Sequence, residues 1–352
     1  LNALADLQER YKSAPGAADV GYELAAAFNR SGSAYDLNRG ETNRWEIKKA
    51  REICENTIRD YPGSDGAKNC AILLGEITGP TLNFAVNDAN VPDQPFLGSL
   101  NFRNVGTVYF RIVKADPEED RNRRQREMGE NLVAKYLALQ PVKAWSVKLP
   151  DDGDFQTHNT QVRIPSLPKG YYVILASDNE GFSYENRPVA YSPAWVTGIS
   201  YVSQRNPEDG KLEIHVLDRD KGTPMKGVSV AAYIREYDYK TRSYLDKLIN
   251  TLTSDENGYI SMAAVRNDSK SFFLKFSQGN DLYFTENYFY LYPTGPTEDT
   301  RITTHFFTDR SIYRHGPTLY FKGIVLERTG TKREITPGYS LVVTFYDVNN
   351  HK

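Results

Sequence analysis

The sequence predicts a mainly β protein in which an N-terminal helical segment is followed by tandem antiparallel β-sandwich domains. Up to about residue 78, apolar residues recur with a period near 3.6, whereas from Thr81 onward they recur at every second position. The β part has short alternating strands at intervals of about 8 to 12 residues, separated by Gly/Pro turns, which is typical of sandwiches. No helices separate the strands regularly, and this argues against a parallel α/β sheet.

Length and composition restrict the possibilities further. The chain has 352 residues, enough for two or three domains. Its 43 basic and 45 acidic residues nearly cancel, so nothing indicates nucleic acid or an anionic membrane as a partner. No apolar run reaches the roughly 20 residues of a membrane helix. The chain begins at Leu1 without a basic and apolar leader, so we expect a mature or excised piece, with any signal or lipid anchor upstream.

Residues 1–79 form the predicted helical segment. A helix over about 44–59 ends at the breaker Tyr61-Pro62-Gly63-Ser64, where Ser64 suits an N-cap, and an Ala-rich helix follows. This arrangement resembles one tetratricopeptide-type hairpin, but we favour a plain helical pair packed against the next domain. Cys54 and Cys70 fall on the two consecutive helices. Two buried thiols and a disulfide both remain open, with thiols preferred.

Residues 80–204 form the first predicted sandwich, with a helical insertion at about 117–140. The insertion begins with the acidic run Asp116-Pro117-Glu118-Glu119-Asp120, in which Pro occupies the first helical turn. A basic cluster follows within the same helix: Arg121, Arg123, Arg124 and Arg126. Because acidic residues flank this cluster at i, i+3 and i+4 spacing, we interpret it as a solvated helix face rather than an anion site. A strand over 189–203 is expected to close the domain.

Residues 205–296 form the second predicted sandwich and residues 297–352 the start of a third. In the second, Ser254-Asp255-Glu256-Asn257-Gly258 predicts a hairpin turn. In the third, a strand over Tyr339–Tyr346 runs into turn-like residues at 347–350. A strand followed by a turn normally returns, so we expect the last domain to be truncated.

The sequence offers no set of residues with catalytic spacing. The five histidines are scattered, at His158, His215, His305, His315 and His351. No nucleophile elbow, phosphate loop, dinucleotide fingerprint or HExxH pair occurs. The acidic turns lack the spacing of a calcium loop. We therefore predict no catalytic, cofactor-binding or metal-binding residue, no cofactor, and no enzymatic activity.

A long segment, Phe307 to Val325, reads FTDRSIYRHGPTLYFKGIV. It resembles the "TDRPIYRPGQTVYFKGIV" segment of the alpha-2-macroglobulin family, with Ser311 and His315 where Pro is usual. Upstream, Gly222-Thr223-Pro224 with Thr253–Tyr259 resembles a macroglobulin (MG2-type) domain pattern. The 80–204 unit resembles the N-terminal macroglobulin-like domain of Bacteroidetes-type members. The resemblance spans about residues 80–352 and implies Ig-like sandwich domains.

The resemblance also implies a function. Members of the family are often broad endopeptidase inhibitors, which trap a protease after it cuts a bait region and capture it with a Cys-Gln thioester in a C-x-E-Q motif. Neither cysteine of this chain lies in such a motif: the sequences are Cys54-Glu55-Asn56-Thr57 and Cys70-Ala71-Ile72-Leu73. We therefore expect a structural scaffold of an exported protease trap, in the periplasm or on the cell surface. Its partners would be proteases, through the full-length protein, and other domains of the same chain.

A cell-surface Ig-like adhesion or carbohydrate-binding module is the alternative. Its sequence basis is a Tyr/Phe-rich strand that offers a possible sugar-stacking platform, made of Tyr283, Tyr288, Tyr290 and Tyr292. A sandwich core that alternates with solvated tyrosine hydroxyls is the simpler interpretation of the same pattern.

Overall fold

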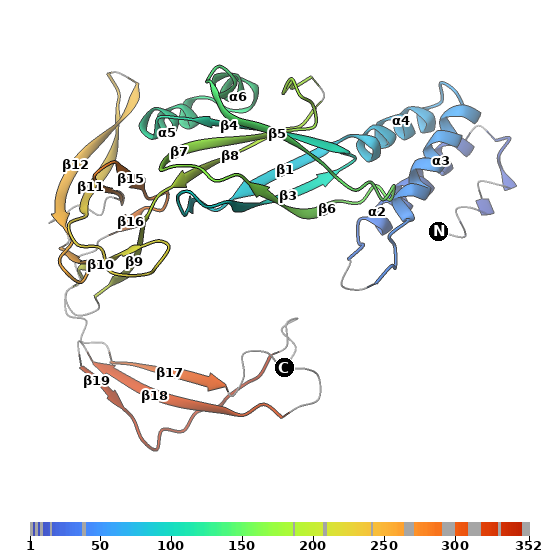
Figure 1. Cartoon of the computed structure of the whole chain (residues 1–352). Helices are drawn as coiled ribbons and strands as arrows, with labels where there is room; N and C mark the ends of the chain where they lie inside the picture. The colour runs from blue at the N-terminus through green and yellow to red at the C-terminus, as the bar shows by residue number, and fades with distance from the viewer. Residues whose placement is uncertain are drawn as a thin grey trace. The chain divides into compact units, whose positions relative to one another are not determined.

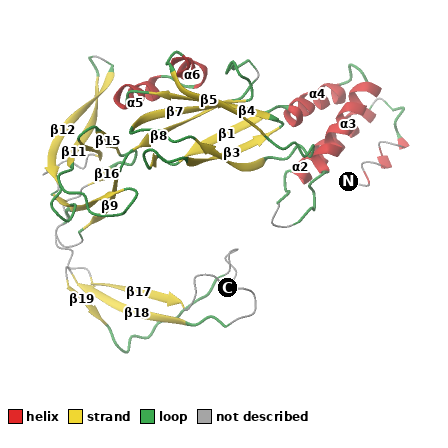
Figure 2. Ribbon diagram, viewed as in Figure 1, coloured by secondary structure: helices red, strands yellow, loops and turns green. Residues whose placement is uncertain are grey.

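The computed structural model describes residues 3–346, apart from residues 4–5, 8–9, 15, 37–39, 186, 207–209, 241, 264–270, 291–299, 309–317 and 330–331. Its contacts divide the chain into two compact units, Leu1–Ile199 with Gly279–Tyr283, and Ser200–Gln278 with Phe284–Lys352. The predicted fold class is confirmed: helices precede a series of antiparallel sheets (Figures 1 and 2). None of the described helices is long and apolar enough to cross a membrane.

Three helices form the N-terminal segment: α2 (Ala17–Gly32), α3 (Glu46–Asp60) and α4 (Asp65–Thr78). They pack around a small core that includes Ala25, Ala50, Cys54, Cys70 and Ile77. Ser64 caps α4 as predicted, because its hydroxyl accepts from the Ala67 N–H at 3.2 Å. The start of α4 touches the backbone of α2 at Gly66, where an added Cβ would lie 2.2 Å from Ala18 carbonyl atoms.

Two facing sheets form the first sandwich. One has the order β1-β3-β6, from β1 (Thr81–Val86), β3 (Phe96–Arg103) and β6 (His158–Ile164). The other has the order β2-β8-β7-β4-β5, from β2 (Ala89–Asn90), β4 (Thr107–Lys114), β5 (Pro141–Lys148), β7 (Gly170–Ser177) and β8 (Val189–Val196). Pairing is antiparallel except between β2 and β8. Alternate side chains of both sheets, such as Leu100 and Phe110, share one buried core.

The predicted insertion consists of α5 (Pro117–Arg126) and α6 (Gly129–Leu137), which lie against this sandwich (Figure 2). Asp116 caps α5 by accepting from the Glu119 N–H at 2.8 Å. Asp120 is buried, and it accepts hydrogen bonds from the hydroxyls of Tyr136 at 2.7 Å and Tyr171 at 2.6 Å. Since Tyr136 lies on α6 and Tyr171 on β7, one carboxylate joins the insertion to the sheet. Burial, together with this neighbouring carboxylate, raises the pKa of Tyr136 above its usual range.

Two further sheets follow, and most of their strands belong to the second unit. One has the order β13-β10-β9, from β9 (Ile199–Arg205), β10 (Leu212–Asp218) and β13 (Tyr259–Met262). The other has the order β12-β11-β14-β15 with β16 also on β14, from β11 (Ser229–Asp238), β12 (Ser243–Thr253), β14 (Ser271–Gln278), β15 (Asp281–Phe284) and β16 (Phe289–Tyr290). Tyr201 of β9 stacks on Phe276 of β14 at 5.0 Å, so the two sheets face each other. The predicted turn before β13 is confirmed, with Gly258 at φ 69°.

The remaining described strands form a three-stranded sheet of order β17-β18-β19, from β17 (Thr300–Thr308), β18 (Phe321–Thr329) and β19 (Lys332–Ile335). The predicted strand over Tyr339–Tyr346 is wrong, because these residues form no strand. A strand needs a neighbour for its backbone hydrogen bonds and a cover for its apolar face. The described residues provide neither, and Val342 is 91% exposed.

The predicted single strand over 189–203 is also wrong. The structure divides it into β8 and β9 at Thr197 and Gly198. The buried Asp281 carboxylate accepts from the Thr197 hydroxyl at 2.6 Å and from the Gly198 N–H at 2.9 Å, while Lys169 pairs with it at 2.8 Å. Because these donors point to a carboxylate, the chain cannot continue a regular strand ladder there.

Candidate functional site

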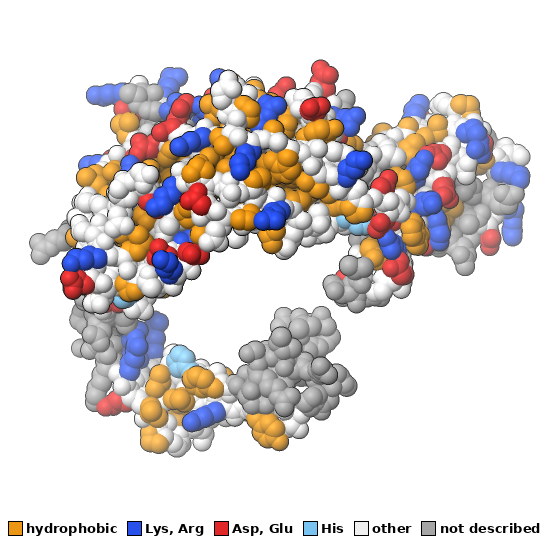
Figure 3. All heavy atoms as spheres, viewed as in Figure 1, with side chains coloured by type: hydrophobic (Ala, Val, Ile, Leu, Met, Phe, Trp, Pro, Cys, Tyr) orange, Lys and Arg blue, Asp and Glu red, His pale blue; other side chains and the backbone are white. Residues whose placement is uncertain are grey.

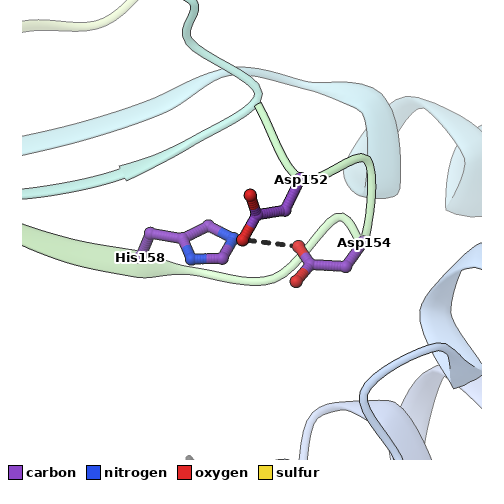
Figure 4. Close-up of side chains that lie close together, drawn as sticks. All are labelled: Asp152, Asp154 and His158. Carbon is purple, nitrogen blue, oxygen red and sulfur yellow. Dashed lines mark hydrogen bonds and ion pairs between the residues drawn. The ribbon is translucent and has the colours of Figure 1, made fainter. Parts of the chain in front are cut away.

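Three side chains of types that suit metal binding or proton transfer lie together in the first unit. Ligand atoms of Asp152, Asp154 and His158 lie within 4.8 Å of one another. Figure 4 shows the His158 ring and the Asp154 carboxylate facing each other at the end of the loop that connects β5 to β6. Within the described part of the first unit, this group has the side chains best suited to a metal or catalytic site.

The loop itself is held by hydrogen bonds from Gln156. Its backbone N–H donates to Asp154 Oδ1 at 3.0 Å, forming an Asx-type turn. Its side-chain amide donates to the carbonyl oxygens of Gly32 at 3.2 Å and Arg44 at 2.9 Å. Since Gly32 ends α2 and Arg44 precedes α3, one glutamine fixes the sandwich loop to the helical segment.

Arg44 completes the cluster from the helical side. Its guanidinium donates through Nε to Asp154 Oδ2 at 3.0 Å and through Nη2 to Asp152 Oδ2 at 2.8 Å. A third contact runs from Nη1 to Glu41 Oε2 at 3.1 Å. The planar guanidinium thus faces three carboxylates with separate N–H groups, which is the geometry that distinguishes arginine from lysine.

Charge stabilises this arrangement most strongly at Asp154, whose side chain is 2% exposed. Burial alone would raise the pKa of Asp154, but hydrogen bonds from the Gln156 N–H, His158 and Arg44 outweigh it and hold the pKa below its usual range. The same carboxylates raise the pKa of Arg44, chiefly through the bond to Asp154. Asp154 is therefore ionised, and its ring partner donates through Nε2–H at 2.9 Å.

The arrangement suits an ion-pair clamp better than a metal centre or a catalytic centre. Two carboxylates and an imidazole are ligands that several divalent cations accept. However, Asp152 Oδ2 and both Asp154 oxygens already accept from protein donors at 2.8–3.0 Å. A cation bound there would lie beside the Arg44 guanidinium, and this like charge would oppose binding. The prediction that the chain has no catalytic, metal or cofactor residue stays a prediction.

A groove of about 460 Å³ opens next to the clamp. Lys48 and Arg51 of α3 line one side, and Asp151 and Asp152 of the loop line the other. The Arg51 guanidinium lies 5.1 Å from the centre of the Phe155 ring at the edge of this groove. Because the lining includes two basic and three acidic side chains, the groove has no strong charge of one sign that would select an ionic ligand.

The two cysteines face each other inside the helical segment. Both are fully buried free thiols, as preferred from the sequence. The hydrogen bond to Cys70 and burial both raise the pKa of Cys54. Since only a thiolate is nucleophilic, Cys54 is an inert core residue rather than a reactive one.

Two arginines of the insertion's basic cluster are paired with acidic residues of their own helix, at the spacing noted in the sequence. Arg124 pairs with Asp120 at 2.9 Å, and Arg123 pairs with Glu119, both at i, i+4 spacing. Arg121 is buried, so it does not belong to a solvated face. These contacts leave little of the cluster to attract an anion.

The other candidate side chains are dispersed. His215 packs against Tyr259 in the second unit, and His305 lies on β17. His315, His351 and Tyr292 lie outside the described residues. The predicted sugar-stacking platform cannot include Tyr283, because this side chain is buried against Trp195 with ring centroids 5.8 Å apart. Tyr288 and Tyr290 are exposed.

Sequence reasoning missed the clamp. The sequence shows three aspartates at residues 151–154. However, Arg44 lies 110 positions from Asp154, and no local sequence pattern links the two residues. In the sequence His158 is only one of five scattered histidines, whereas in the structure its ring is hydrogen-bonded to Asp154. A tyrosine cluster is exposed at the β11–β12 hairpin, where the Tyr237 ring centroid lies 5.1 Å from those of both Tyr239 and Tyr244.

No family model matches the sequence, and no curated protein matches it. Solved structures with detectable similarity include Escherichia coli alpha-2-macroglobulin. Its NIE-MG1 fragment is 14% identical, with 59% of this chain and 97% of that chain covered and a TM-score of 0.40. Its MG0-NIE-MG1 fragment is 13% identical over 59% of this chain and 64% of that chain, with a TM-score of 0.41.

Other sandwich proteins are also similar. The Ig1 and Ig2 domains of DIP-gamma are 10% identical over 59% of this chain and 95% of theirs, with a TM-score of 0.20. This chain spans less than two thirds of the longer alpha-2-macroglobulin fragment. At these scores the fold assignment rests on the sheets described above, and function rests on the sequence and the described contacts.

Proposed function

We propose that this chain is a structural scaffold region of a bacterial alpha-2-macroglobulin-like endopeptidase inhibitor. The observation that carries the proposal is the resemblance of residues 307–325 to the family's segment. Sandwich architecture upstream of that segment is compatible with it. In this proposal the parent protein is exported to the periplasm or the cell surface, and proteases are partners of the parent rather than of this chain.

Contacts between the helical segment and the first sandwich suit a rigid structural part. The Arg44 clamp ties the start of α3 to the β5–β6 loop. A second tie lies at the end of α4, where Asn104 donates to the Ile77 carbonyl at 2.7 Å and Arg103 donates to the Glu76 carbonyl at 2.8 Å. The last carbonyls of a helix lack partners within it, so these side chains satisfy them. Both ties favour a rigid spacer.

The chain contains no C-x-E-Q motif, so the proposal assigns covalent capture to other parts of the parent protein. The first experiment mixes the purified chain with a serine endopeptidase and measures cleavage of a large protein substrate and a small chromogenic peptide. We expect no inhibition of either cleavage and no covalent adduct on a denaturing gel. Stoichiometric inhibition by this chain alone would show that the inhibitory region lies within it.

The second experiment reads the coding sequence downstream. A C-x-E-Q motif within about 600 to 1,200 further residues, several domain lengths on, would support the trap. Its absence, together with an extracellular location and glycan binding, would support the alternative instead.

One observation favours that alternative, a cell-surface adhesion or carbohydrate-binding module. The tyrosine cluster of the β11–β12 hairpin is exposed, with Tyr239 85% accessible, and Arg235 lies 5.5 Å from the Tyr244 ring. Exposed aromatic faces stack on sugars and on partner proteins. Binding on a glycan array that is lost in Tyr239→Ala would support this function over the scaffold.

A further inference from the structure

Three arginines lie side by side across the three-stranded sheet of the second unit. The antiparallel register places Arg301 of β17 directly opposite Arg328 of β18, and Arg328 directly opposite Arg333 of β19. Neighbouring strands are about 4.8 Å apart, so the row is about 10 Å long. All three side chains point to the same face, since they border one groove of about 300 Å³.

Like charges directly opposite each other destabilise a sheet. The row places two such pairs in succession. In the same register Glu327 lies opposite Glu334, and each adjoins an arginine in sequence. Because successive side chains of a strand point to opposite faces, both glutamates belong to the other face. Among the described residues, Arg301 and Arg333 make no ion pair or hydrogen bond, whereas Arg328 has a partner of its own.

The rest of the groove is lined by two further hydrogen-bond donors and one apolar side chain. Thr303 and His305 follow Arg301 on the same face of β17, and Leu326 precedes Arg328 on β18. A hydroxyl and an imidazole N–H can donate to oxygen, as guanidinium groups do. Figure 3 shows basic and apolar side chains on the visible surface of this sheet, with a histidine between them.

We propose that this arginine row is a binding site for a small soluble oxyanion of the phosphate class. A carboxylate carries one charge and two oxygens, which one guanidinium fork can satisfy. A phosphate group carries up to two charges and three or more acceptor oxygens, which match several adjacent guanidinium groups. The groove has the volume of a small-ligand pocket rather than that of a macromolecular interface. The inference goes beyond the scaffold function and does not depend on it.

The test titrates the full chain with sodium pyrophosphate at low ionic strength and follows the heat of binding. We expect saturable binding at one site. Arg328→Gln, which removes the central guanidinium, is expected to weaken binding by about tenfold or more, as loss of a charge-assisted pair does. Lys322→Gln is the matched control, because it removes a positive charge from the same strand, outside the groove, and should leave the affinity unchanged.

Hydrogen exchange supplies a second measurement. Pyrophosphate should slow exchange of the β18 amides in the wild-type chain and not in Arg328→Gln. If that variant does not fold, the exposed Arg301→Gln and Arg333→Gln replace it, and each should weaken binding. The proposal is overturned by absence of saturable binding, by equal affinity in the arginine variants, or by binding only to phospholipid vesicles or to polyglutamate.

Discussion

Replacing Asp154 by asparagine tests whether the Arg44 clamp stabilises the first unit. The change keeps the size of the side chain and removes a charge that is 2% exposed and contacts Arg44, His158 and the Gln156 N–H. Breaking a buried ion pair costs about 3–5 kcal/mol. Arg44 is 20% exposed and keeps its contacts with Asp152 and Glu41, so the expected loss is smaller, about 2 kcal/mol.

The assay is urea unfolding followed by tryptophan fluorescence. All three tryptophans, Trp45, Trp145 and Trp195, lie in the first unit, so the signal reports that unit alone. The control is Asp152→Asn, which also removes a carboxylate from Arg44 but at a site 45% exposed, where a pair is worth about 0–1 kcal/mol. If Asp154→Asn unfolds at the wild-type urea concentration, or if Asp152→Asn costs as much, the clamp does not stabilise the unit as argued.

Three further predictions concern the same unit and use the same fluorescence signal. The pKa of Asp154 is lower in the folded state than in the unfolded chain, where it is about 4. Its contribution to the free energy of unfolding should therefore be complete above about pH 4 and should be lost as the pH falls through the folded-state pKa. The Asp154→Asn variant should lack this loss. Gly66→Ala should cost about 2–3 kcal/mol because its Cβ would overlap the α2 backbone, whereas Gly75→Ala in the same helix, with open space around it, should stabilise by about 0.5–1 kcal/mol. Tyr136→Phe should cost about 1–2 kcal/mol by removing one donor to the buried Asp120.

Each of these predictions has an outcome that contradicts it. If Asp154→Asn loses stability at low pH as the wild-type chain does, the acid sensitivity comes from other carboxylates. Equal effects of the two glycine substitutions would mean that helix propensity, not contact with α2, decides them. A neutral Tyr136→Phe would mean that the remaining partners of Asp120, Tyr171 and Arg124, satisfy its carboxylate without the Tyr136 hydroxyl.

Local sequence patterns predict much of the fold. The change of hydrophobic period near Thr81 marks the passage from helices to sheets, and Ser64 and Asp116 act as the N-caps their positions suggest. The turn before β13 follows from its Asp and Gly residues. Such features depend on residues within about one helical turn or one hairpin, so a single sequence is enough to read them.

Local patterns also misled. The strand predicted at Tyr339–Tyr346 has suitable alternation, but strand formation needs a neighbouring strand and the described residues provide none. The strand predicted over 189–203 is interrupted because Asp281, distant in sequence, accepts hydrogen bonds from Thr197 and Gly198. In both cases the outcome depends on a partner that the segment itself does not contain.

The sequence alone determined the order of helices and sheets, the absence of a C-x-E-Q motif from this chain, and the family resemblance that motivates a scaffold function. Only the tertiary structure decided which charged groups meet. Arg44 reaches Asp154 across 110 positions, and the row of Arg301, Arg328 and Arg333 exists only because the strand register aligns them. The physical reason is one of range: hydrophobic period and capping act within a few residues, whereas ion pairs and strand register depend on how distant segments pack.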